Sequence, residues 1–310
     1  MEKTIKVFAP ATVSNVGCGF DTLGFALNEP GDIVILKKNN LNKIKVTKIT
    51  GDKGAISKKM EENTASMAVK HLLSKLNDSI GIDIEIRKKM PLSSGLGSSA
   101  ASAVAAVFAA NKLLNNPFSK NELLEFALLG EKVASKAIHA DNVAPCLFGG
   151  FILVRDYNPA DIVELNYPRN MYCTVLYPQL KINTSEARKL IKKNLQLTKA
   201  RRHFGNIGAL VAGLNNSDYE LIGKSIVDEI SEPFRSKLIP GYFDIKNAAL
   251  TAGAIACNIS GSGPSIFAFS KNQKEANKIG AEMMLALKKK NIQGKVYISK
   301  INPNGPKVIG

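Results

Sequence analysis

The pattern of hydrophobic and polar residues is clearest between residues 82 and 114. Ile82, Ile84 and Ile86 alternate with charged residues, which is the pattern of a strand with one buried face. From Ser98 onwards nearly every residue is alanine or another small or apolar residue, which predicts a buried helix over 98–114. A segment rich in glycine and serine joins the two stretches. The sequence therefore predicts a strand, a turn and a helix in direct succession.

Similar patterns predict the other elements of the first half. Asn63 or Thr64 can cap a helix that runs to Leu76, and Ser119 and Glu122 have the spacing of a capping box. The remaining predicted elements are strands at 4–9, 32–36 and 151–154, an exposed hairpin over the lysine- and asparagine-rich residues 37–60, and a helix over 123–131.

The second half of the chain predicts the order βαββαβ once inserted helices are set aside, which is typical of a ferredoxin-like layer. The segment 156–169 has two prolines and no sustained period, so we expect a boundary there between domains 1–160 and 161–310. The predicted elements are strands at 171–177, 254–259, 265–270 and 295–301, and helices at 184–194, 198–214, 217–230, 242–252 and 274–290. The fold class predicted for the whole chain is α+β.

Composition favours a chain that folds in water. The 310 residues are 45% hydrophobic, and we find no long apolar run without charges, so we expect one or two domains and no membrane span. The N-terminus lacks the pattern of a signal peptide. The four cysteines are scattered, with no CxxC pair, which argues against zinc and against disulfides. A reducing, cytoplasmic location is expected.

The net charge of +16 raises the question of nucleic-acid or membrane binding. The lysines are spread along the chain without aromatic residues between them. This favours a solvated lysine-rich surface, and we expect neither a nucleic-acid nor a membrane partner. Lysines assigned to this surface include those at Lys37-Lys38, Lys58-Lys59, Lys88-Lys89 and 288–290.

The turn before the alanine-rich helix has the chemistry of an anion site. The first N–H groups of a helix have no partner within it, and Gly95 and Gly97 let a phosphate approach the backbone. Ser98, Ser99 and Ser102 add hydroxyls. The residues alone also fit a serine cap on an ordinary core helix. They lack the Lys-Ser/Thr ending of a Walker loop and the acidic residue of a dinucleotide site.

Residues 91–100 read P-x-x-x-G-L-G-S-S-A, which resembles the signature of the galactokinase, homoserine, mevalonate and phosphomevalonate (GHMP) kinases. The resemblance implies a small-molecule kinase with two domains. The N-terminal domain would be like domain 2 of ribosomal protein S5, the C-terminal domain ferredoxin-like, and the active site between them. The implied ATP-binding residues are Asn63, Pro91, Leu92, Ser93, Ser94, Gly95, Leu96, Gly97, Ser98, Ser99, Ala100 and Ala101.

The same resemblance implies that Ser99 and Glu131 hold Mg²⁺. Such a site suits Mg²⁺, which takes one or two protein oxygens and completes its shell with phosphates and water. Without the resemblance, Glu131 reads as a glutamate that faces solvent.

Further segments resemble homoserine kinases in particular. The resemblance implies that Asp21 binds the ammonium group of an amino acid and that Arg188 and Arg235 bind its carboxylate, while Asn15, His139, Asn142 and Thr184 surround the rest of it. The segments are the apolar loop from Ala9 to Leu27, H-x-D-N-V-A-P-x-x-x-G-G from His139, N-T-x-E-A-R from Asn183, E-P-x-R-x-K-L-I-P from Glu232, and I-S-G-S-G-P-S from Ile259.

These residues also have ordinary explanations when taken singly. Asn15 and Asp21 could cap a tight turn, and His139 could be a core histidine.

We predict Asp141 and Asn142 as catalytic residues. Asp141 aligns with a general base of some relatives, but a loose phosphoryl-transfer transition state needs positioning more than a strong base, so the proton acceptor stays open.

The resemblance covers essentially the whole chain and implies transfer of phosphate from Mg-ATP to the side-chain hydroxyl of L-homoserine, a step of threonine biosynthesis. The alternatives are a sibling kinase for another small alcohol and a non-catalytic relative that binds ATP or nucleic acid. A homodimer is compatible with the sequence.

Overall fold

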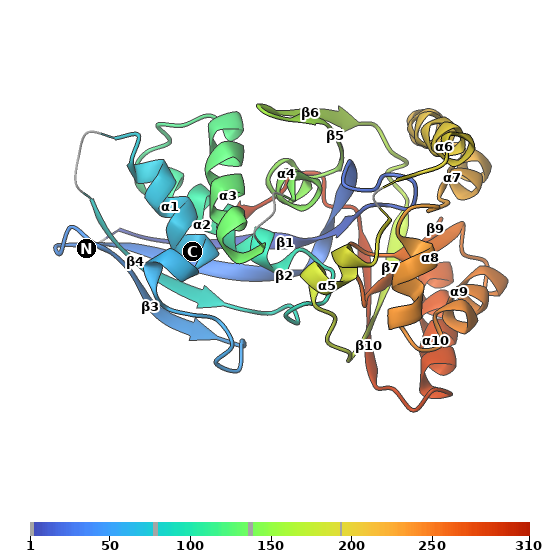
Figure 1. The fold of residues 1–310 in the computed structure, drawn as a ribbon. Coiled ribbons are helices and arrows are strands. Elements are labelled where there is room, and N and C mark those ends of the chain that lie inside the picture. The colour runs from blue at the N-terminus through green and yellow to red at the C-terminus, as the bar shows by residue number, and fades with distance from the viewer. Residues whose placement is uncertain (1–2, 77–79, 136–138, 193) are drawn as a thin grey trace.

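The computed structural model describes residues 3–76, 80–135, 139–192 and 194–310, and it contains two β-sheets with helices packed against them (Figure 1). The elements of the first half are β1 (Thr4–Ser14), β2 (Leu23–Asn39), β3 (Ile44–Thr50), η1 (Met60–Glu62), α1 (Thr64–Leu73), β4 (Gly81–Arg87), α2 (Ser98–Leu113), α3 (Lys120–Ser135), α4 (Ala140–Phe148), β5 (Phe151–Tyr157) and β6 (Ala160–Leu165). Those of the second half are β7 (Tyr172–Pro178), α5 (Thr184–Lys189), α6 (Leu197–Asn216), α7 (Tyr219–Ser225), α8 (Glu232–Arg235), η2 (Ser236–Leu238), α9 (Tyr242–Thr251), β8 (Ala256–Ile259), β9 (Ile266–Ser270), α10 (Gln273–Lys288), β10 (Gly294–Lys300) and β11 (Lys307–Val308).

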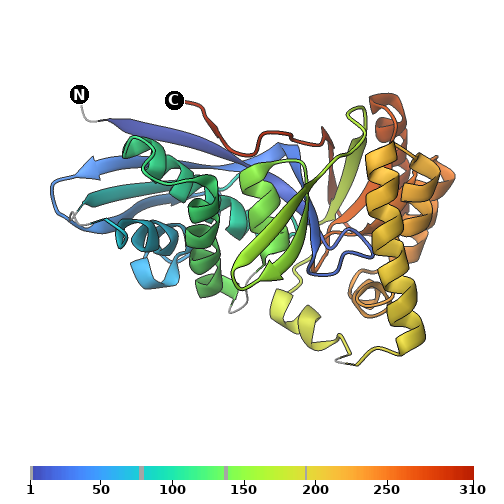
Figure 2. The same ribbon diagram turned by 90° about the horizontal axis from the view of Figure 1, so that it is seen from above.

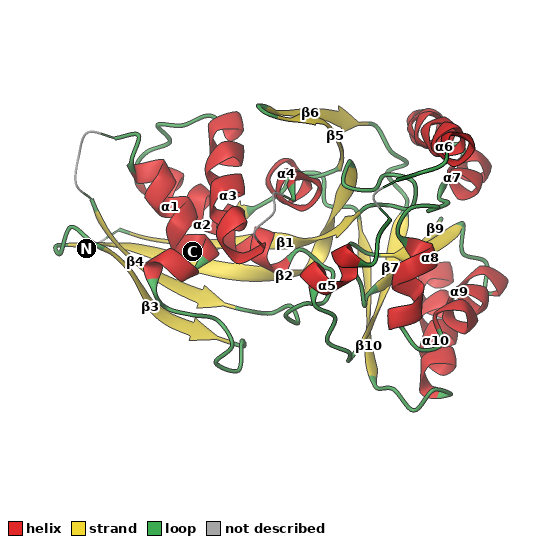
Figure 3. Ribbon diagram, viewed as in Figure 1, coloured by secondary structure: helices red, strands yellow, loops and turns green. Residues whose placement is uncertain are grey.

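The first sheet carries the predicted strand–turn–helix unit. Its strands lie in the order β11-β1-β2-β4-β3, and β5 pairs with both β2 and β6. Helices α1 to α4 lie over one face of this sheet (Figure 3). The alanine-rich α2 packs on β1 and β2, because its small side chains let the helix come close to the strands. This packing fixes the N-terminus of α2 at one end of the sheet.

The second sheet has the predicted ferredoxin-like order. Its strands lie in the order β10-β7-β9-β8, and all neighbours are antiparallel. Helices α9 and α10 pack against each other and against these strands. The α+β class and the two-layer organisation of the second half are therefore as expected from the sequence.

Local capping signals are confirmed. Asn63 caps α1, because its Oδ1 accepts hydrogen bonds from the N–H groups of Ala65 at 3.1 Å and Ser66 at 3.3 Å. The capping box before α3 also forms. The Ser119 N–H donates to Glu122 Oε2 at 2.8 Å, and the Glu122 N–H donates to Ser119 Oγ at 3.4 Å.

The predicted hairpin over 37–60 is wrong. β3 does not pair with β2 but lies parallel to β4 at the edge of the sheet, and β4 separates the two. A parallel pair needs a crossover connection, and α1 provides it between β3 and β4. The lysine-rich composition marks an edge strand here rather than a hairpin.

Other differences concern the length and kind of elements. β1 and β2 are longer than predicted, α7 ends at Ser225, and α5 ends at Lys189 rather than at 194. Residue 193 of that predicted helix lies outside the described residues. The polar segment from His139 forms helix α4, and part of the expected boundary segment forms β6.

The chain returns to its starting sheet at the end. β11 pairs with β1, and the Lys6 N–H donates to the Gly310 carbonyl at 2.7 Å, so the two ends of the chain lie on the same side of the molecule (Figure 2). β6 pairs with β5 in the first sheet and ends at Leu165. The division into domains at residue 160 stays a prediction. Within the described ranges, each helix is too short or too polar to cross a bilayer.

Candidate functional site

A cavity of about 860 Å³ is lined by residues from both halves of the chain, including residues of α5. Three of the predicted site residues do not line it: Leu96 and Ala101 are buried in the core, and Pro91 lies outside the cavity wall. The predicted residues that line it are Asn15, Asp21, Asn63, Leu92, Ser93, Ser94, Gly95, Gly97, Ser98, Ser99, Ala100, Glu131, His139, Asp141, Asn142, Thr184, Arg188 and Arg235.

The loop before α2 needs its glycines. Gly95 and Gly97 have left-handed φ angles of 78° and 65°. A Cβ on Gly95 would lie 2.4 Å from the Ser260 carbonyl oxygen, and one on Gly97 would lie 2.1 Å from Thr12 Oγ1. The loop also contacts the segment from Ile259, because Ser260 Oγ donates to the Gly95 carbonyl at 2.6 Å. The two glycine-rich segments therefore pack together, as the resemblance implied.

A buried ion pair holds the start of α2, and the sequence reading missed it. Lys88 was assigned to the solvated surface, but its side chain is only 1% exposed and pairs with Asp32. Lys88 Nζ also donates to the Ser98 carbonyl at 2.7 Å and to Ser102 Oγ at 2.8 Å. The Asp32 carboxylate accepts from Ser98 Oγ at 2.9 Å. Desolvation is tolerated because both charges are paired and hydrogen-bonded.

Ser99 and Glu131 meet in the cavity. Ser99 Oγ donates to Glu131 Oε1 at 2.7 Å. Glu131 is 2% exposed, so the reading of Glu131 as a solvent-facing residue is wrong. Burial raises the pKa of its carboxyl to about 7, and the hydrogen bond from Ser99 and the charge of Lys88 oppose that rise. A buried carboxylate beside a hydroxyl fits a hard cation. Within the described ranges, no three His, Cys, Asp or Glu side chains cluster as a metal site.

Arg235 is a buried cation in the cavity wall. The residue is 2% exposed, and Nη1 donates to the Gly261 carbonyl at 2.8 Å. Its Nε has no hydrogen-bond partner among the described residues. Burial lowers the pKa of this guanidinium, and Asp228 and Asp21 oppose that shift. A buried guanidinium with an unused donor is a suitable group for an anion that enters the cavity.

Arg188 pairs with Asp21, and both residues line the cavity. Arg188 Nη1 donates to Asp21 Oδ1 at 3.2 Å, and Nη2 contacts Asp21 Oδ2. This contact raises the pKa of Arg188. The Asp21 N–H donates to Asn15 Oδ1 at 3.1 Å, so the loop holds its own aspartate in place. Taken singly, Asn15 and Asp21 were expected to cap a tight turn. The side chain of Asn15 does so, whereas that of Asp21 binds Arg188, and both residues line the cavity.

Asn142 is fixed by β1. Its Oδ1 accepts from Thr12 Oγ1 at 2.7 Å, and its Nδ2 donates to Ser14 Oγ at 2.9 Å. The neighbouring Asp141 is 2% exposed, and burial together with the charge of Asp21 raises the pKa of its carboxyl to about 7. Thr12 was missed by the sequence reading, because only the folded sheet brings it beside the start of α4.

The last two predicted residues also reach the cavity. His139 precedes α4, and burial lowers the pKa of its imidazole, so the ring is neutral near pH 7. Thr184 Oγ1 lies 3.2 Å from Ser262 Oγ. α5 thus contacts the second glycine-rich segment.

Comparison with protein families gives two matches. The GHMP kinases N terminal domain matches residues 63–150, and the GHMP kinases C terminal domain matches residues 210–288. The mevalonate kinase of L. major, solved with R-mevalonate, has 17% sequence identity and a TM-score of 0.71 over 97% of each chain. At that identity the likeness shows the fold alone.

Relatives of higher sequence identity show which group of GHMP kinases this chain is most similar to among those compared. The homoserine kinase of Chlorobium phaeobacteroides (strain BS1) is 47% identical over 99% of this chain and 100% of the relative. That of Pyrococcus abyssi is 35% identical over 95% and 96%. The crystal structure of homoserine kinase from Cytophaga hutchinsonii has 52% identity and a TM-score of 0.98, and it covers 100% of this chain and 98% of that one. The chain therefore belongs to the GHMP kinases and, within them, to the homoserine kinase family.

Proposed function

We propose that this chain transfers the γ-phosphoryl group of ATP to the side-chain hydroxyl of L-homoserine, as part of threonine biosynthesis. The observation that carries the proposal is that one cavity is lined both by the glycine-rich loop at the N-terminus of α2 and by the Asp21 carboxylate with the guanidinium groups of Arg188 and Arg235. The first is a phosphate site, and the second is complementary to a zwitterion. Relatives that match over the full length of the chain are named homoserine kinases.

The loop and the start of α2 would bind the triphosphate. Gly95 and Gly97 line the cavity, and the buried pair of Lys88 and Asp32 keeps the first turn of α2 in place. Ser99 and Glu131 would hold Mg²⁺, which when bound neutralises charge on the β- and γ-phosphate oxygens. Asn63 would border the nucleotide at the start of α1.

The charged groups of the cavity wall would hold the amino acid. Arg235 and Arg188 would bind the α-carboxylate, and Asp21 would bind the ammonium group. The cavity is also lined by His139, Asn15 and Thr184. Binding of both charged groups on the α-carbon leaves the hydroxyl at the far end of the side chain free to approach the γ-phosphate, and such alignment supplies much of the rate in phosphoryl transfer.

We assign Asp141 as the group that accepts the proton of the substrate hydroxyl. It lies beside Asn142 in the cavity wall, and the pKa of about 7 of its carboxyl suits a proton acceptor near neutral pH. Asn142 cannot take a proton. Because Thr12 and Ser14 fix its amide, it would orient the hydroxyl.

The experiment is coupled detection of ADP release with Mg-ATP and L-homoserine. We expect turnover with L-homoserine and at least a hundredfold lower kcat/KM with mevalonate or galactose, since neither offers the zwitterion. Equal rates with all three acceptors, or release of ADP only in their absence, would overturn the proposal.

Location and assembly complete the proposal. The four cysteines are all buried and free, which suits a reducing cytoplasm. We propose a homodimer without nucleic-acid partners, to be tested by light scattering and by filter binding with RNA at physiological salt. A monomer in the first test, or retention of RNA in the second, would contradict these two parts.

A further inference from the structure

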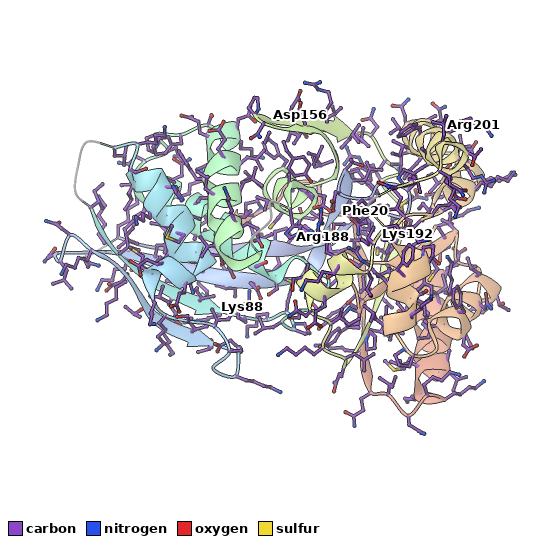
Figure 4. All side chains as sticks on the ribbon, in the orientation of Figure 1. Phe20, Lys88, Asp156, Arg188, Lys192 and Arg201 are labelled. Carbon is purple, nitrogen blue, oxygen red and sulfur yellow. The ribbon has the colours of Figure 1, made fainter. Side chains whose placement is uncertain are left out.

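One aromatic ring lies close to both arginines of the cavity wall. The guanidinium carbon of Arg188 lies 5.7 Å from the centre of the Phe20 ring, and that of Arg235 lies 5.5 Å from it. Figure 4 shows Phe20 beside Arg188. Both distances are within the range of cation–π attraction. Phe20 itself does not line the cavity.

The loop that carries Phe20 is held at several points. Asn15 Nδ2 donates to the Gly261 carbonyl at 3.0 Å, and Asn15 Oδ1 accepts from the Asp21 N–H. The Tyr157 hydroxyl donates to the Asp21 carbonyl at 2.6 Å. Val16 has a φ of 38°, which is strained for a β-branched residue. The ring is therefore presented from a backbone that is fixed before and after it.

The two guanidinium groups differ in what else holds them. Arg188 has a carboxylate partner in Asp21, whereas the described contacts of Arg235 within hydrogen-bond reach are limited to the Gly261 carbonyl. Two like charges near each other in a partly dry wall repel. The negative face of a ring offsets part of this repulsion without occupying the donors that a substrate carboxylate needs.

We infer that Phe20 is a positioning residue for carboxylate recognition: its ring holds Arg188 and Arg235 so that both guanidinium groups face the same carboxylate. The inference rests on the proposed function. It assigns a specificity role to a residue that does not line the cavity.

The test replaces the ring with an aliphatic side chain of similar reach. Phe20→Leu is expected to raise the KM for L-homoserine about 10-fold or more, while the KM for ATP stays within about twofold. Phe20→Tyr keeps the ring and should restore the KM for L-homoserine. Phe204→Leu, at a ring that is 67% exposed, is the matched control and should have no effect.

A substrate without the carboxylate separates positioning from a general structural role. With 3-aminopropan-1-ol, which is homoserine without its carboxylate, wild type and Phe20→Leu should have the same kcat/KM. An equal loss with both acceptors, a parallel rise in the KM for ATP, or no change with homoserine would overturn the inference. Phe20→Met is a second variant without a ring, measured in case Phe20→Leu does not fold. Thermal unfolding shows which variants are folded. If wild type itself does not phosphorylate L-homoserine, it is the proposed function that fails.

Discussion

Asp21 and Arg188 form an ion pair that joins the loop after β1 to the end of α5. The side chains keep 27% and 44% of their exposure, so the pair lies at the edge of the cavity and not in the core. In the proposed complex Asp21 binds the ammonium group and Arg188 the carboxylate, both of which are on the α-carbon of the amino acid. A zwitterion therefore replaces one ion pair with two, whereas an acceptor with only one charge leaves one of the two residues without its partner.

This exchange predicts how the chain discriminates against 4-hydroxybutanoate, which is homoserine without the ammonium group. We expect wild type to prefer homoserine by about 10²-fold or more in kcat/KM, because binding of 4-hydroxybutanoate leaves Asp21 unpaired. In Asp21→Ala this preference should fall to about tenfold or less. Asp156→Ala, at an exposed aspartate of β5, is the control (Figure 4). An unchanged ratio in Asp21→Ala would count against the assignment of the ammonium site.

Arg235 gives the second prediction. Arg235→Ala should lower kcat/KM for homoserine by the equivalent of about 2–4 kcal/mol, since the substrate carboxylate loses a charged donor in a buried wall. Steady-state kinetics measure this loss, mainly in KM. Arg201→Ala, at an exposed arginine of α6, should leave both constants unchanged. A homoserine KM equal to that of wild type in Arg235→Ala would refute the role of Arg235.

Sequence and structure agree where the determinants are local. The cap at Asn63, the capping box at Ser119 and the alanine-rich α2 depend on residues within one turn or one face of a helix. Helix α4 was not predicted, because Pro145 lies inside it and its polar start reads as a turn. Family resemblance, rather than periodicity, suggested the residues of the cavity.

Burial depends on partners that are distant in sequence, and this is where the sequence reading failed. Lys88 looks like a surface lysine until Asp32, 56 residues earlier, is placed beside it. Glu131 looks solvent-facing until Ser99 and α2 cover it. Pattern reading compares neighbours along the chain, so it does not reveal a charge that is buried by a distant one.

The pair of Lys88 and Asp32 gives the third prediction. Lys88→Met leaves the Asp32 carboxylate buried without its counter-charge and should destabilise the fold by about 3–5 kcal/mol. The double variant Asp32→Asn with Lys88→Met should recover part of this loss, because no unpaired charge remains. Urea unfolding of Lys88→Met, Asp32→Asn and the double variant measures the effect. A double variant whose loss equals the sum of the two single losses would exclude the coupling.

Glu131 gives the fourth prediction, which concerns stability. Its carboxyl has an ordinary pKa of 4.5, and burial raises that pKa to about 7 in the folded state. Between these values the folded state binds more protons than the unfolded state, so stability falls as pH rises from 4.5 through 7. Glu131→Gln avoids this cost and should be more stable than wild type by about 3 kcal/mol at pH 8, without metal, and by little at pH 4.5.

Thermal or urea unfolding at the two pH values measures this difference. Added Mg-ATP should stabilise wild type more than Glu131→Gln, because the variant lacks the anionic ligand. Glu122→Gln is the control. Hydrogen bonds from Ser119 lower the pKa of Glu122, so they stabilise its charged form. Replacing this carboxylate with an amide should therefore destabilise the chain at pH 8, which is the opposite sign to Glu131→Gln. A Glu131→Gln variant less stable than wild type at pH 8 would show that the carboxylate is held in its charged form.

Asp141 gives the last prediction, which concerns the pH dependence of catalysis. As a proton acceptor it must be ionised, and its pKa is raised to about 7 by burial and by Asp21. Below pH 7 the acceptor is protonated, so kcat/KM of wild type should fall as the pH drops, and more steeply where Glu131 also takes up a proton. Asp141→Asn should lose about 10²–10⁴-fold in kcat, and its remaining activity should fall less steeply at acid pH. Asn142→Asp, added to Asp141→Asn, puts back a carboxyl but removes the orienting amide. The double variant should therefore not recover the kcat that Asp141→Asn loses. If Asp141→Asn keeps kcat within tenfold of wild type, the hydroxyl proton leaves without this carboxylate and alignment alone accounts for catalysis.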